Sequence, residues 1–350
     1  KKAISLKPHY AEAYYNMGIV LQEQNDLQSA TKLYMKAIQL NPNYAEAYNN
    51  LATTLKEQGK INKAIDFFKK AISLKPHYAE AYYNMGKVQK EKNKFEESIK
   101  FYNKALSLKS DYFEAYYNIG IIFQEQGKLE EAIDYFNKAL LIKPNYEKAQ
   151  AQKLYQKAKI CDWEKFIEDR EITNKLGKLN NDIPPFTMLT FQDEPDSHLL
   201  RSQIYVKKNL YQKQIPFKKN IQFFKNKRLR IGYFSADFQN HATMYLMADI
   251  FEKYNREKFK VYVYSFGKSK DSDEIRKKLK NSVDVFRDVI NVDEKNIAVL
   301  SREDKIDIAI DLKGYTRNSR PKIFAYRAAP IQINFLGYPG TTGAKFMDYI

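Results

Sequence analysis

Residues 11–44 read AEAYYNMGIVLQEQNDLQSATKLYMKAIQLNPNY, and the chain returns to this pattern every 34 residues. An aromatic residue, a small residue and an alanine recur in register: Tyr14, Tyr48, Tyr82 and Tyr116; Gly18, Ala52, Gly86 and Gly120; Ala37, Ala71, Ala105 and Ala139. A fixed period of this length is typical of a stacked array of helix pairs, because one pair cannot bury its apolar face alone. The first part of the chain is therefore predicted to be an α-solenoid.

The order of residues within one unit supports this prediction. Apolar residues at spacings of three and four form one stripe on each of two helices: Tyr14, Met17, Gly18 and Leu21, then Leu27, Ala30, Tyr34, Ala37 and Ile38. Pro42, Pro76 and Pro144 have no amide hydrogen, so the second helix is expected to end beside them. Ser110 takes this place in the third unit, where we expect a less sharply defined end. The whole order resembles the tetratricopeptide repeat.

Asparagine also recurs in register, two positions after the first aromatic residue of each unit: Asn16, Asn50, Asn84 and Asn118. Asparagine is a weak helix former, so its repetition within helices needs a reason. A side-chain amide both donates and accepts, which suits binding the backbone of an extended polypeptide. The alternative is that each asparagine bonds a neighbouring helix and joins the repeats. We favour peptide binding by these four residues.

The composition narrows the class of protein. The 350 residues carry a formal net charge of +17, from 59 Lys and Arg against 42 Asp and Glu. Most of the lysines are scattered singly, so the concentrated basic stripe of a nucleic-acid binder is not predicted. Cys161 is the single cysteine, which excludes an internal disulfide framework and fits a reducing compartment. With no apolar run long enough to span a bilayer, we expect a cytoplasmic protein without nucleic-acid or membrane partners.

Three parts are expected along the chain. Residues 1–150 form the repeat superhelix, 151–227 a capping helix and a connecting segment, and 228–350 a second domain. Residues 171–226 are expected to be irregular because they contain Pro184, Pro185, Pro195 and Pro216. The chain opens without methionine and stops in a strand-like run, so we expect a fragment of a longer protein. The oligomeric state is left open.

In the second domain, β-rich apolar runs alternate with helical stretches. The runs cover residues 229–234, 259–266, 306–312 and 331–336, with helical stretches such as 243–254 and 294–305 between them. This alternation predicts a parallel sheet covered by helices, a Rossmann-like α/β domain. Ligands meet such sheets at the carboxyl ends of the strands, which here are followed by loops 235–241, 313–320 and 337–343.

These three loops carry a family resemblance. The strings are RIGYFSADF at 230–238 with His241, DLKGYT at 311–316, RAAPIQ at 327–332 and LGYPGTT at 336–342, and CDW at 161–163 matches the junction before them. Together with the repeats they resemble the O-GlcNAc transferase family. The resemblance implies a GT-B glycosyltransferase whose N-terminal lobe is residues 228–350, while the second lobe, which binds most of the nucleotide sugar, is absent.

The resemblance and the loop positions together suggest roles for single residues. His241 is the main catalytic candidate, as a base or as an orienting group, because histidine exchanges protons near neutral pH. Asp237 and Asp311 are secondary catalytic candidates. The candidates for binding donor or substrate are Tyr315, Thr316, Gly337, Tyr338, Pro339, Gly340 and Thr341. The asparagine ladder is similar to one in the family.

Asp271, Ser272 and Asp273 imitate an acid-x-acid metal motif, but they precede a helical stretch, where Asp and Ser are ordinary caps. The other histidines lack partners at zinc spacing, so no metal and no cofactor is expected. The resemblance implies inverting transfer of N-acetylglucosamine from UDP-GlcNAc to Ser or Thr of polypeptides held by the repeats. The alternatives are a Spindly-type protein O-fucosyltransferase that uses GDP-fucose and a non-catalytic, peptide-binding scaffold. The fragment alone is expected to be inactive.

Overall fold

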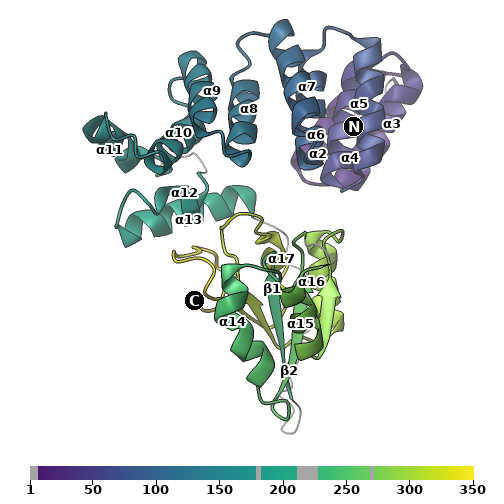
Figure 1. The fold of residues 1–350 in the computed structure, drawn as a ribbon. Helices are drawn as coiled ribbons and strands as arrows, with labels where there is room; N and C mark the ends of the chain where they lie inside the picture. The colour runs from purple at the N-terminus through teal and green to yellow at the C-terminus, as the bar shows by residue number, and fades with distance from the viewer. Residues whose placement is uncertain (1–6, 179–182, 211–227, 269–271) are drawn as a thin grey trace. The chain divides into compact units, whose positions relative to one another are not determined.

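The structure is a computed structural model, and it describes residues 7–178, 183–210, 228–268 and 272–350. The chain divides into two units, Lys1–Trp163 and Glu164–Ile350. In the described residues the first unit is helical, and the second is built around a parallel sheet (Figure 1). Both predicted parts of the fold, the repeat solenoid and the parallel α/β domain, are confirmed.

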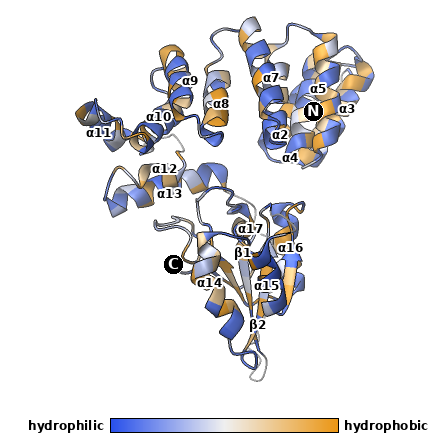
Figure 2. Cartoon of the chain, viewed as in Figure 1, coloured by the Kyte–Doolittle hydropathy of each residue, from blue (hydrophilic) through white to orange (hydrophobic). Residues whose placement is uncertain are grey.

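The first unit consists of successive helix pairs and one further helix. Their bounds are α2 Ala11–Glu23, α3 Leu27–Leu40, α4 Ala45–Glu57, α5 Ile61–Leu74, α6 Ala79–Glu91, α7 Phe95–Leu108, α8 Phe113–Glu125, α9 Leu129–Ile142 and α10 Glu147–Lys159. Figure 2 shows hydrophobic and hydrophilic residues mixed along these helices. Such mixing is expected where each helix buries one stripe and exposes the rest.

Each repeat closes around a fully buried aromatic ring of its second helix: Tyr34, Phe68, Tyr102 and Phe136. The first helix meets the ring with a small residue. A Cβ placed on Gly18 would lie 2.6 Å from the Tyr34 ring, and one on Gly86 would lie 2.6 Å from the Tyr102 ring. Glycine therefore lets the two helices of a repeat approach each other, in agreement with the predicted small positions.

The second helices of the four pairs end 34 residues apart, at Leu40, Leu74, Leu108 and Ile142. The residues that follow these helices have similar backbone angles, and Lys109 (φ −145°, ψ 91°), in the repeat that lacks a proline, is close to Asn41 (φ −136°, ψ 92°). The expectation of a less defined end beside Ser110 is therefore wrong. The chain must turn there to begin the next helix in register, so stacking ends α7 where proline is missing.

The second unit holds a five-stranded sheet in the order β3-β2-β1-β4-β5, with every neighbouring pair parallel. The strands are β1 Leu229–Ser235, β2 Phe259–Ser265, β3 Val285–Asp288, β4 Ile308–Asp311 and β5 Ile331–Asn334. The connecting helices are α14 Ala242–Lys253, α15 Glu274–Ser282, α16 Glu294–Glu303 and α17 Lys322–Ala325. The sequence analysis missed β3, because this strand reads VFRD and its two charged residues leave too few apolar positions to form a pattern.

Alternate residues of β1 enter different cores, one on each face of the sheet. Tyr233 packs with Met247 of α14 and Leu279 of α15. Phe234 packs on the other face in a cluster that includes residues of α16 and α17, and its ring stacks on Tyr264 at a centroid distance of 4.4 Å. Both faces are thus covered by helices, which explains why the strands read as nearly continuous apolar runs.

The segment before the sheet contains three helices, α11 Phe166–Lys175, α12 Pro185–Met188 and α13 Pro195–Asn209. The prediction of irregular structure from residue 171 to 226 is therefore wrong for the described part, and residues 211–227, with Pro216, lie outside it. Pro185 and Pro195 stand in the first turns of α12 and α13. A proline is favourable there, since the first amide groups of a helix have no intrahelical partner.

Candidate active site

The loops that follow the strands meet at one edge of the sheet, because parallel strands end on the same side. Two glycines allow backbone to touch backbone at this edge. A Cβ on Gly267, after β2, would lie 1.8 Å from the carbonyl oxygen of Ala236. A Cβ on Gly337, after β5, would lie 1.7 Å from the carbonyl oxygen of Leu312. Packing of neighbouring strand ends thus requires glycine at both positions.

Asp237, Lys313 and His241 converge at this edge. Lys313 Nζ lies 2.6 Å from Asp237 Oδ2, and the two side chains are only 7% and 10% exposed. His241 Nδ1 lies 3.7 Å from the same oxygen, and its side chain is 44% exposed. A buried ammonium group needs a carboxylate partner, because it has lost its hydration. Lys313 and Asp237 therefore neutralise each other beside the histidine.

His241 is the N-cap of α14, with an extended backbone (φ −152°, ψ 150°). The backbone N–H of Thr243 donates to His241 Nδ1 at 3.2 Å, and the Thr243 hydroxyl lies 3.1 Å from the same nitrogen. A ring nitrogen that accepts a hydrogen bond carries no hydrogen, so the neutral ring holds its proton on Nε2. With Nδ1 turned to the cap of α14, Nε2 is the ring nitrogen that remains to meet a ligand.

Asp311, the last residue of β4, is turned toward its own loop. Its Oδ1 accepts the N–H of Lys313 at 2.9 Å, and its Oδ2 accepts the N–H of Gly314 at 3.1 Å. Burial raises the pKa of this carboxyl to about 6, although the two backbone hydrogen bonds oppose the shift. Asp311 thus shapes the turn that presents Lys313, and its oxygens are occupied by backbone groups.

The two hydroxyl candidates after β4 are engaged within the fold. Tyr315 is buried, and its hydroxyl donates to the carbonyl oxygen of Thr342 at 2.5 Å. The Thr316 hydroxyl donates to the carbonyl oxygen of Lys313 at 2.8 Å. Burial raises the pKa of the Tyr315 hydroxyl above its ordinary value. Both residues therefore tie loops together in this structure.

The loop after β5 is mostly covered by packing. The Tyr338 ring is 4% exposed, and the Ser202 hydroxyl of α13 donates to the carbonyl oxygen of Thr341 at 2.9 Å. Gly340 is half-buried, whereas Pro339 is exposed. Leu336 adopts a left-handed backbone (φ 67°), which is uncommon for a branched side chain. This strained and partly open end of the loop is its most accessible part.

Residues 327–332 form hydrogen bonds that hold neighbouring backbone segments of the second unit. Arg327 donates to the carbonyl oxygen of Phe346 and pairs with Asp348. The fully buried Gln332 side chain accepts from Ala328 N and donates to the carbonyl oxygens of Phe324 and Phe346. This part of the resemblance therefore coincides with scaffolding of the second unit.

Asp273 is the N-cap of α15, as predicted, and its Oδ1 accepts the N–H of Arg276 at 2.9 Å. Its Oδ2 accepts the N–H of Asn240, next to His241, at 2.8 Å, so the cap also holds the loop after β1. Asp271 lies outside the described residues. Within the described ranges, no group of three or more His, Cys, Asp or Glu could hold a metal ion.

The sequence analysis missed Lys313, which the structure brings to the centre of the site. One signal could have identified it. Lys313 follows the strand β4 closely and stands between the apolar Leu312 and the Gly-Tyr pair, where a buried position is expected. Lysine is seldom buried without a partner, so a carboxylate from another strand end could have been expected opposite it.

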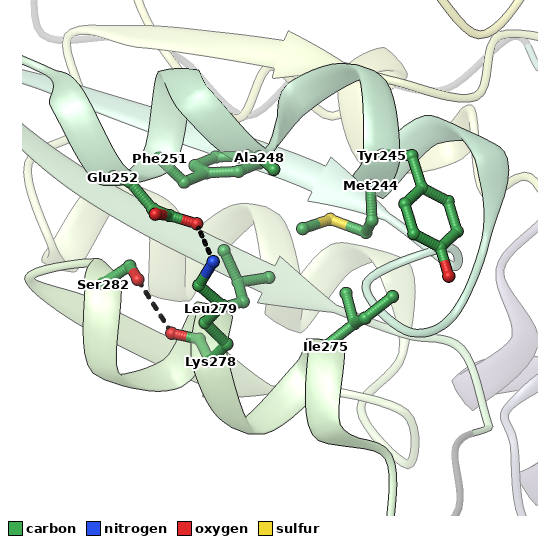
Figure 3. A pocket seen from close by; sticks show the side chains of 9 residues that line it. All are labelled: Met244, Tyr245, Ala248, Phe251, Glu252, Ile275, Lys278, Leu279 and Ser282. Carbon is green, nitrogen blue, oxygen red and sulfur yellow. Dashed lines mark hydrogen bonds and ion pairs between the residues drawn. The ribbon is translucent and has the colours of Figure 1, made fainter.

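A shallow groove of about 140 Å³ lies between α14 and α15. Figure 3 shows Met244 and Tyr245 of α14 and Ile275 of α15 at one end, and the ion pair of Glu252 with Lys278 at the other. The groove is lined mostly by apolar side chains. None of the predicted site residues lines it, so it is separate from the His241 cluster.

The asparagine ladder makes contacts between repeats. Asn50 Nδ2 donates to the Tyr15 hydroxyl at 3.1 Å, and Asn118 Nδ2 donates to the Tyr83 hydroxyl at 3.0 Å. Asn84 Nδ2 donates to Asn49 Oδ1 at 3.1 Å. Asn16 is exposed. Among the described residues, the amide oxygens of Asn84 and Asn118 accept no hydrogen bond.

Charged side chains form a second row between the same helices. Lys56 pairs with Glu91 at 2.6 Å, and Lys90 pairs with Glu125 at 3.2 Å. Each of these pairs joins residues 35 apart, as the asparagine contacts do. Neighbouring first helices are thus connected by one amide row and one charged row, both of which follow the period of the sequence.

Comparison with family models gives different matches for the repeat region and for the region of the sheet. Residues 194–350 match the model of glycosyl transferase family 41. Residues 10–76, 89–127 and 113–146 match models of tetratricopeptide repeats. No helix in the described part of the chain has the length and apolar character needed to cross a bilayer.

Similar proteins were found among curated sequences and solved structures. The probable UDP-N-acetylglucosamine–peptide N-acetylglucosaminyltransferase SEC of Arabidopsis thaliana is 44% identical over 124 residues, which cover 35% of this chain and 13% of that protein. The UDP-N-acetylglucosamine–peptide N-acetylglucosaminyltransferase of Caenorhabditis elegans is 34% identical over 213 residues, covering 55% of this chain and 18% of that protein. The structure of an O-GlcNAc transferase variant from Thermobaculum terrenum aligns over 97% of this chain and 52% of its own, with 21% identity and a TM-score of 0.45. The chain spans less than a fifth of the length of these two curated relatives.

Proposed function

We propose a function from one premise: the chain belongs to the O-GlcNAc transferase family. In this proposal the protein transfers N-acetylglucosamine from UDP-GlcNAc to Ser or Thr hydroxyls of polypeptides, with inversion at the anomeric carbon. The repeats bind the acceptor polypeptide, and the sheet unit forms one side of the catalytic cleft. The resemblance assigns most contacts with the nucleotide sugar to a second lobe. We therefore expect these 350 residues alone to bind the acceptor polypeptide but to have little or no transferase activity.

The observation that carries the proposal is the meeting of Asp237, Lys313 and His241 at the carboxyl edge of a parallel sheet. In the transfer step the acceptor oxygen attacks the anomeric carbon, the bond to the diphosphate breaks, and the hydroxyl proton passes to an oxygen of the departing diphosphate. Nε2 of His241 donates a hydrogen bond to an oxygen that gains negative charge in this step. Such a positioned donor stabilises the transition state more than the ground state.

The repeats position the acceptor at a distance from the chemistry. Amide oxygens of Asn84 and Asn118, whose nitrogens are held by the preceding repeat, accept backbone N–H groups of an extended polypeptide. An amide that is held on its nitrogen side loses little further freedom on binding, so the ladder is pre-organised. The binding energy of this remote contact then orients the acceptor at the cleft.

The proposal also covers the sugar donor, the cellular compartment and the metal requirement of the reaction. Relatives named SPINDLY, such as the one from Hordeum vulgare at 40% identity over 126 residues, match the chain as well. That relative is named as an N-acetylglucosaminyltransferase, so the alternative of a GDP-fucose donor rests on the family resemblance and is tested separately. We propose a cytoplasmic setting, which suits the exposed free thiol of Cys161. The step uses no metal, and polypeptides are the proposed partners.

The experiment compares His241→Ala with His77→Ala in the full-length protein. UDP-GlcNAc and GDP-fucose are offered separately at saturation with a peptide library, and transfer is followed by mass spectrometry. His241→Ala should lower kcat about 10²-fold or more. His77 is exposed in the repeats, so its variant should keep the rate of the unchanged protein.

Three outcomes would contradict this proposal. Near-normal transfer by a folded His241→Ala protein would remove His241 from the reaction. Turnover of GDP-fucose in place of UDP-GlcNAc would replace the donor. Tight binding of peptides without transfer from either donor would favour the non-catalytic scaffold.

A further inference from the structure

The carboxylate of Asp237 has two basic neighbours and lies closer to one of them than to the other. Its Oδ2 is 2.6 Å from Lys313 Nζ, a distance typical of a short charge-assisted hydrogen bond. The same oxygen is 3.7 Å from His241 Nδ1, which is too far for a hydrogen bond but close enough for a strong electrostatic effect. Lys313 therefore decides how much negative charge the imidazole experiences.

The imidazole has two competing states. In the first state, which fits the hydrogen bond from Thr243 N to Nδ1, a neutral ring holds its proton on Nε2. In the competing state, Nδ1 gains a proton and turns its hydrogen toward Asp237, which breaks the cap of α14. The second state needs a carboxylate with uncompensated charge, because an opposite charge within about 4–6 Å favours the protonated ring.

The other charged side chains around the loop already form hydrogen bonds or ion pairs with groups other than His241. Asp273 of α15 accepts from Asn240 N and from Arg276 N. The Arg276 guanidinium donates to the carbonyl oxygen of Phe238 and pairs with Asp288 of β3 at 2.6 Å. The Asp311 carboxylate accepts backbone N–H groups of its own loop.

Helix α14 itself opposes a charged ring. His241 stands at its N-terminus, where the helix dipole disfavours a positive charge, and the first turn of α14 contains no acidic residue. Tyr245 of that turn directs its hydroxyl to Asn240 Oδ1 at 2.9 Å. Asp237 is thus the carboxylate whose charge, if released, would act on the histidine.

We propose that Lys313 is a positioning residue that keeps the His241 ring neutral, with its proton on Nε2, by taking up the charge of Asp237. This inference deepens the proposed function, on which it rests, because it names the group that holds His241 in its donating state. Lys313 acts through Asp237 and need not touch substrate.

The test is a titration of histidine ring nitrogens by NMR, which requires neither donor nor acceptor. The chain has four histidines, so ¹⁵N-labelled histidine gives few signals, and His241→Gln assigns one of them. At pH 8 the unchanged protein should show an unprotonated Nδ1 and a protonated Nε2 for His241. In Lys313→Met the titration midpoint of His241 should rise by about 1 pH unit or more, with a hydrogen on Nδ1.

Two further variants separate charge from structure. Lys313→Arg keeps the positive charge and should keep the midpoint. The double variant Lys313→Met with Asp237→Asn removes both charges and should return the midpoint to that of the unchanged protein. The signals of His9, His77 and His198, which lie elsewhere, should stay in place throughout and report an intact fold.

The proposal is overturned if folded Lys313→Met keeps the original midpoint, or if the double variant shifts it by a full pH unit. A proton on Nδ1 in the unchanged protein at pH 8 overturns it as well, and that measurement stands even if Lys313→Met does not fold. These results are distinct from a failure of the proposed function. A protein that transfers no sugar still titrates, and a protein that transfers sugar can still have the other tautomer.

Discussion

The two units of this protein use polar contacts in opposite ways. In the repeat unit, Asn50 reaches Tyr15 and Lys56 reaches Glu91, each across 35 residues, and later repeats carry equivalent contacts. In the sheet unit, Lys313 reaches Asp237 across 76 residues, and this contact occurs once. A repeated contact between neighbours can be lost locally, because the other repeats keep theirs. A single contact between distant strands has no such substitute.

The largest effect is expected from a substitution at Gly337, where the backbone lies against the carbonyl group of Leu312. In Gly337→Ala the new methyl group would overlap the carbonyl oxygen of Leu312, since a Cβ there would lie 1.7 Å away. We expect the sheet unit to lose about 3 kcal/mol of unfolding free energy. Hydrogen exchange of peptides from β1 and β4, followed by mass spectrometry, measures this loss separately from the helices.

Gly59→Ala is the matched control in the repeat unit. Gly59 has a positive φ of 78°, but nothing lies within 4 Å of a Cβ placed there. Only backbone strain remains, so the expected loss is about 1 kcal/mol. Equal losses in the two variants would remove the contrast between the units.

A second effect, no larger than the first, depends on pH and comes from Asp311. In the folded protein this carboxyl has a pKa of about 6, whereas its ordinary value is 3.8. The folded state therefore binds more protons between these values, and Asp311 makes folding less favourable as the pH rises from about 4 to about 6. The difference corresponds to about 3 kcal/mol at most.

Asp311→Asn should remove this part of the pH dependence. Urea unfolding of both proteins at pH 4 and at pH 7 gives the change in unfolding free energy, and the variant should lose less stability between the two values. The repeat helices provide the comparison, since their exchange rates, corrected for pH, should respond equally in both proteins. An identical pH dependence in the two proteins would contradict the role of burial at Asp311.

Substitutions in the asparagine ladder test whether the loss of one repeated contact destabilises only the neighbouring helices. Asn118→Ala removes the hydrogen bond to the Tyr83 hydroxyl and should cost about 1 kcal/mol, seen as faster exchange in α6 and α8 only. Asn16→Ala is the control, because Asn16 is exposed and should cost nothing measurable. The variant with all four asparagines replaced should bind extended polypeptides more weakly. Unchanged binding with a large fall in Tm would make the ladder purely structural.

The smallest effect compares two tyrosines at the same place in different repeats. Tyr34 donates through its hydroxyl to Gln22 Oε1 at 2.9 Å. The Tyr102 hydroxyl is buried and has no hydrogen-bond partner among the described residues, since Ser98 beside it donates to the carbonyl oxygen of Gly86. Tyr102→Phe should therefore stabilise by up to about 1 kcal/mol, whereas Tyr34→Phe should destabilise by about 1 kcal/mol. A loss of stability in Tyr102→Phe, measured by thermal unfolding, would contradict this difference.

Prediction from sequence succeeded where a pattern was repeated or long. The 34-residue period located the helices of the repeat unit, and the runs at 229–234 and 259–266 located β1 and β2 to within one residue at each end. It failed where the local signal was weak or ambiguous. Two of the four residues of strand β3 are charged, and α13 begins at Pro195, whose role at a helix start looks the same in sequence as a break.

The candidate site was predicted in part. Placing His241 and Asp237 in the loop after β1 needed only the chain order of strand and loop. Their relation to Lys313 could not be read in the same way, because the order of strands in the sheet sets which loops meet, and β4 pairs with β1 across more than 70 residues. The ordinary function of Tyr315 and Thr316 as loop ties is likewise visible only once their carbonyl partners are known.

What the sequence determined by itself is the solenoid, the parallel α/β domain and the family resemblance, because these depend on periodicity and on local strings of residues. What only the tertiary structure decided is which groups surround the ring nitrogens of His241, which charge Asp237 meets, and which glycines lie against a neighbouring carbonyl group. These properties arise from atoms that distant segments bring within about 2–4 Å of each other. At such distances burial and charge decide the chemistry of a group, and no spacing along the chain records them.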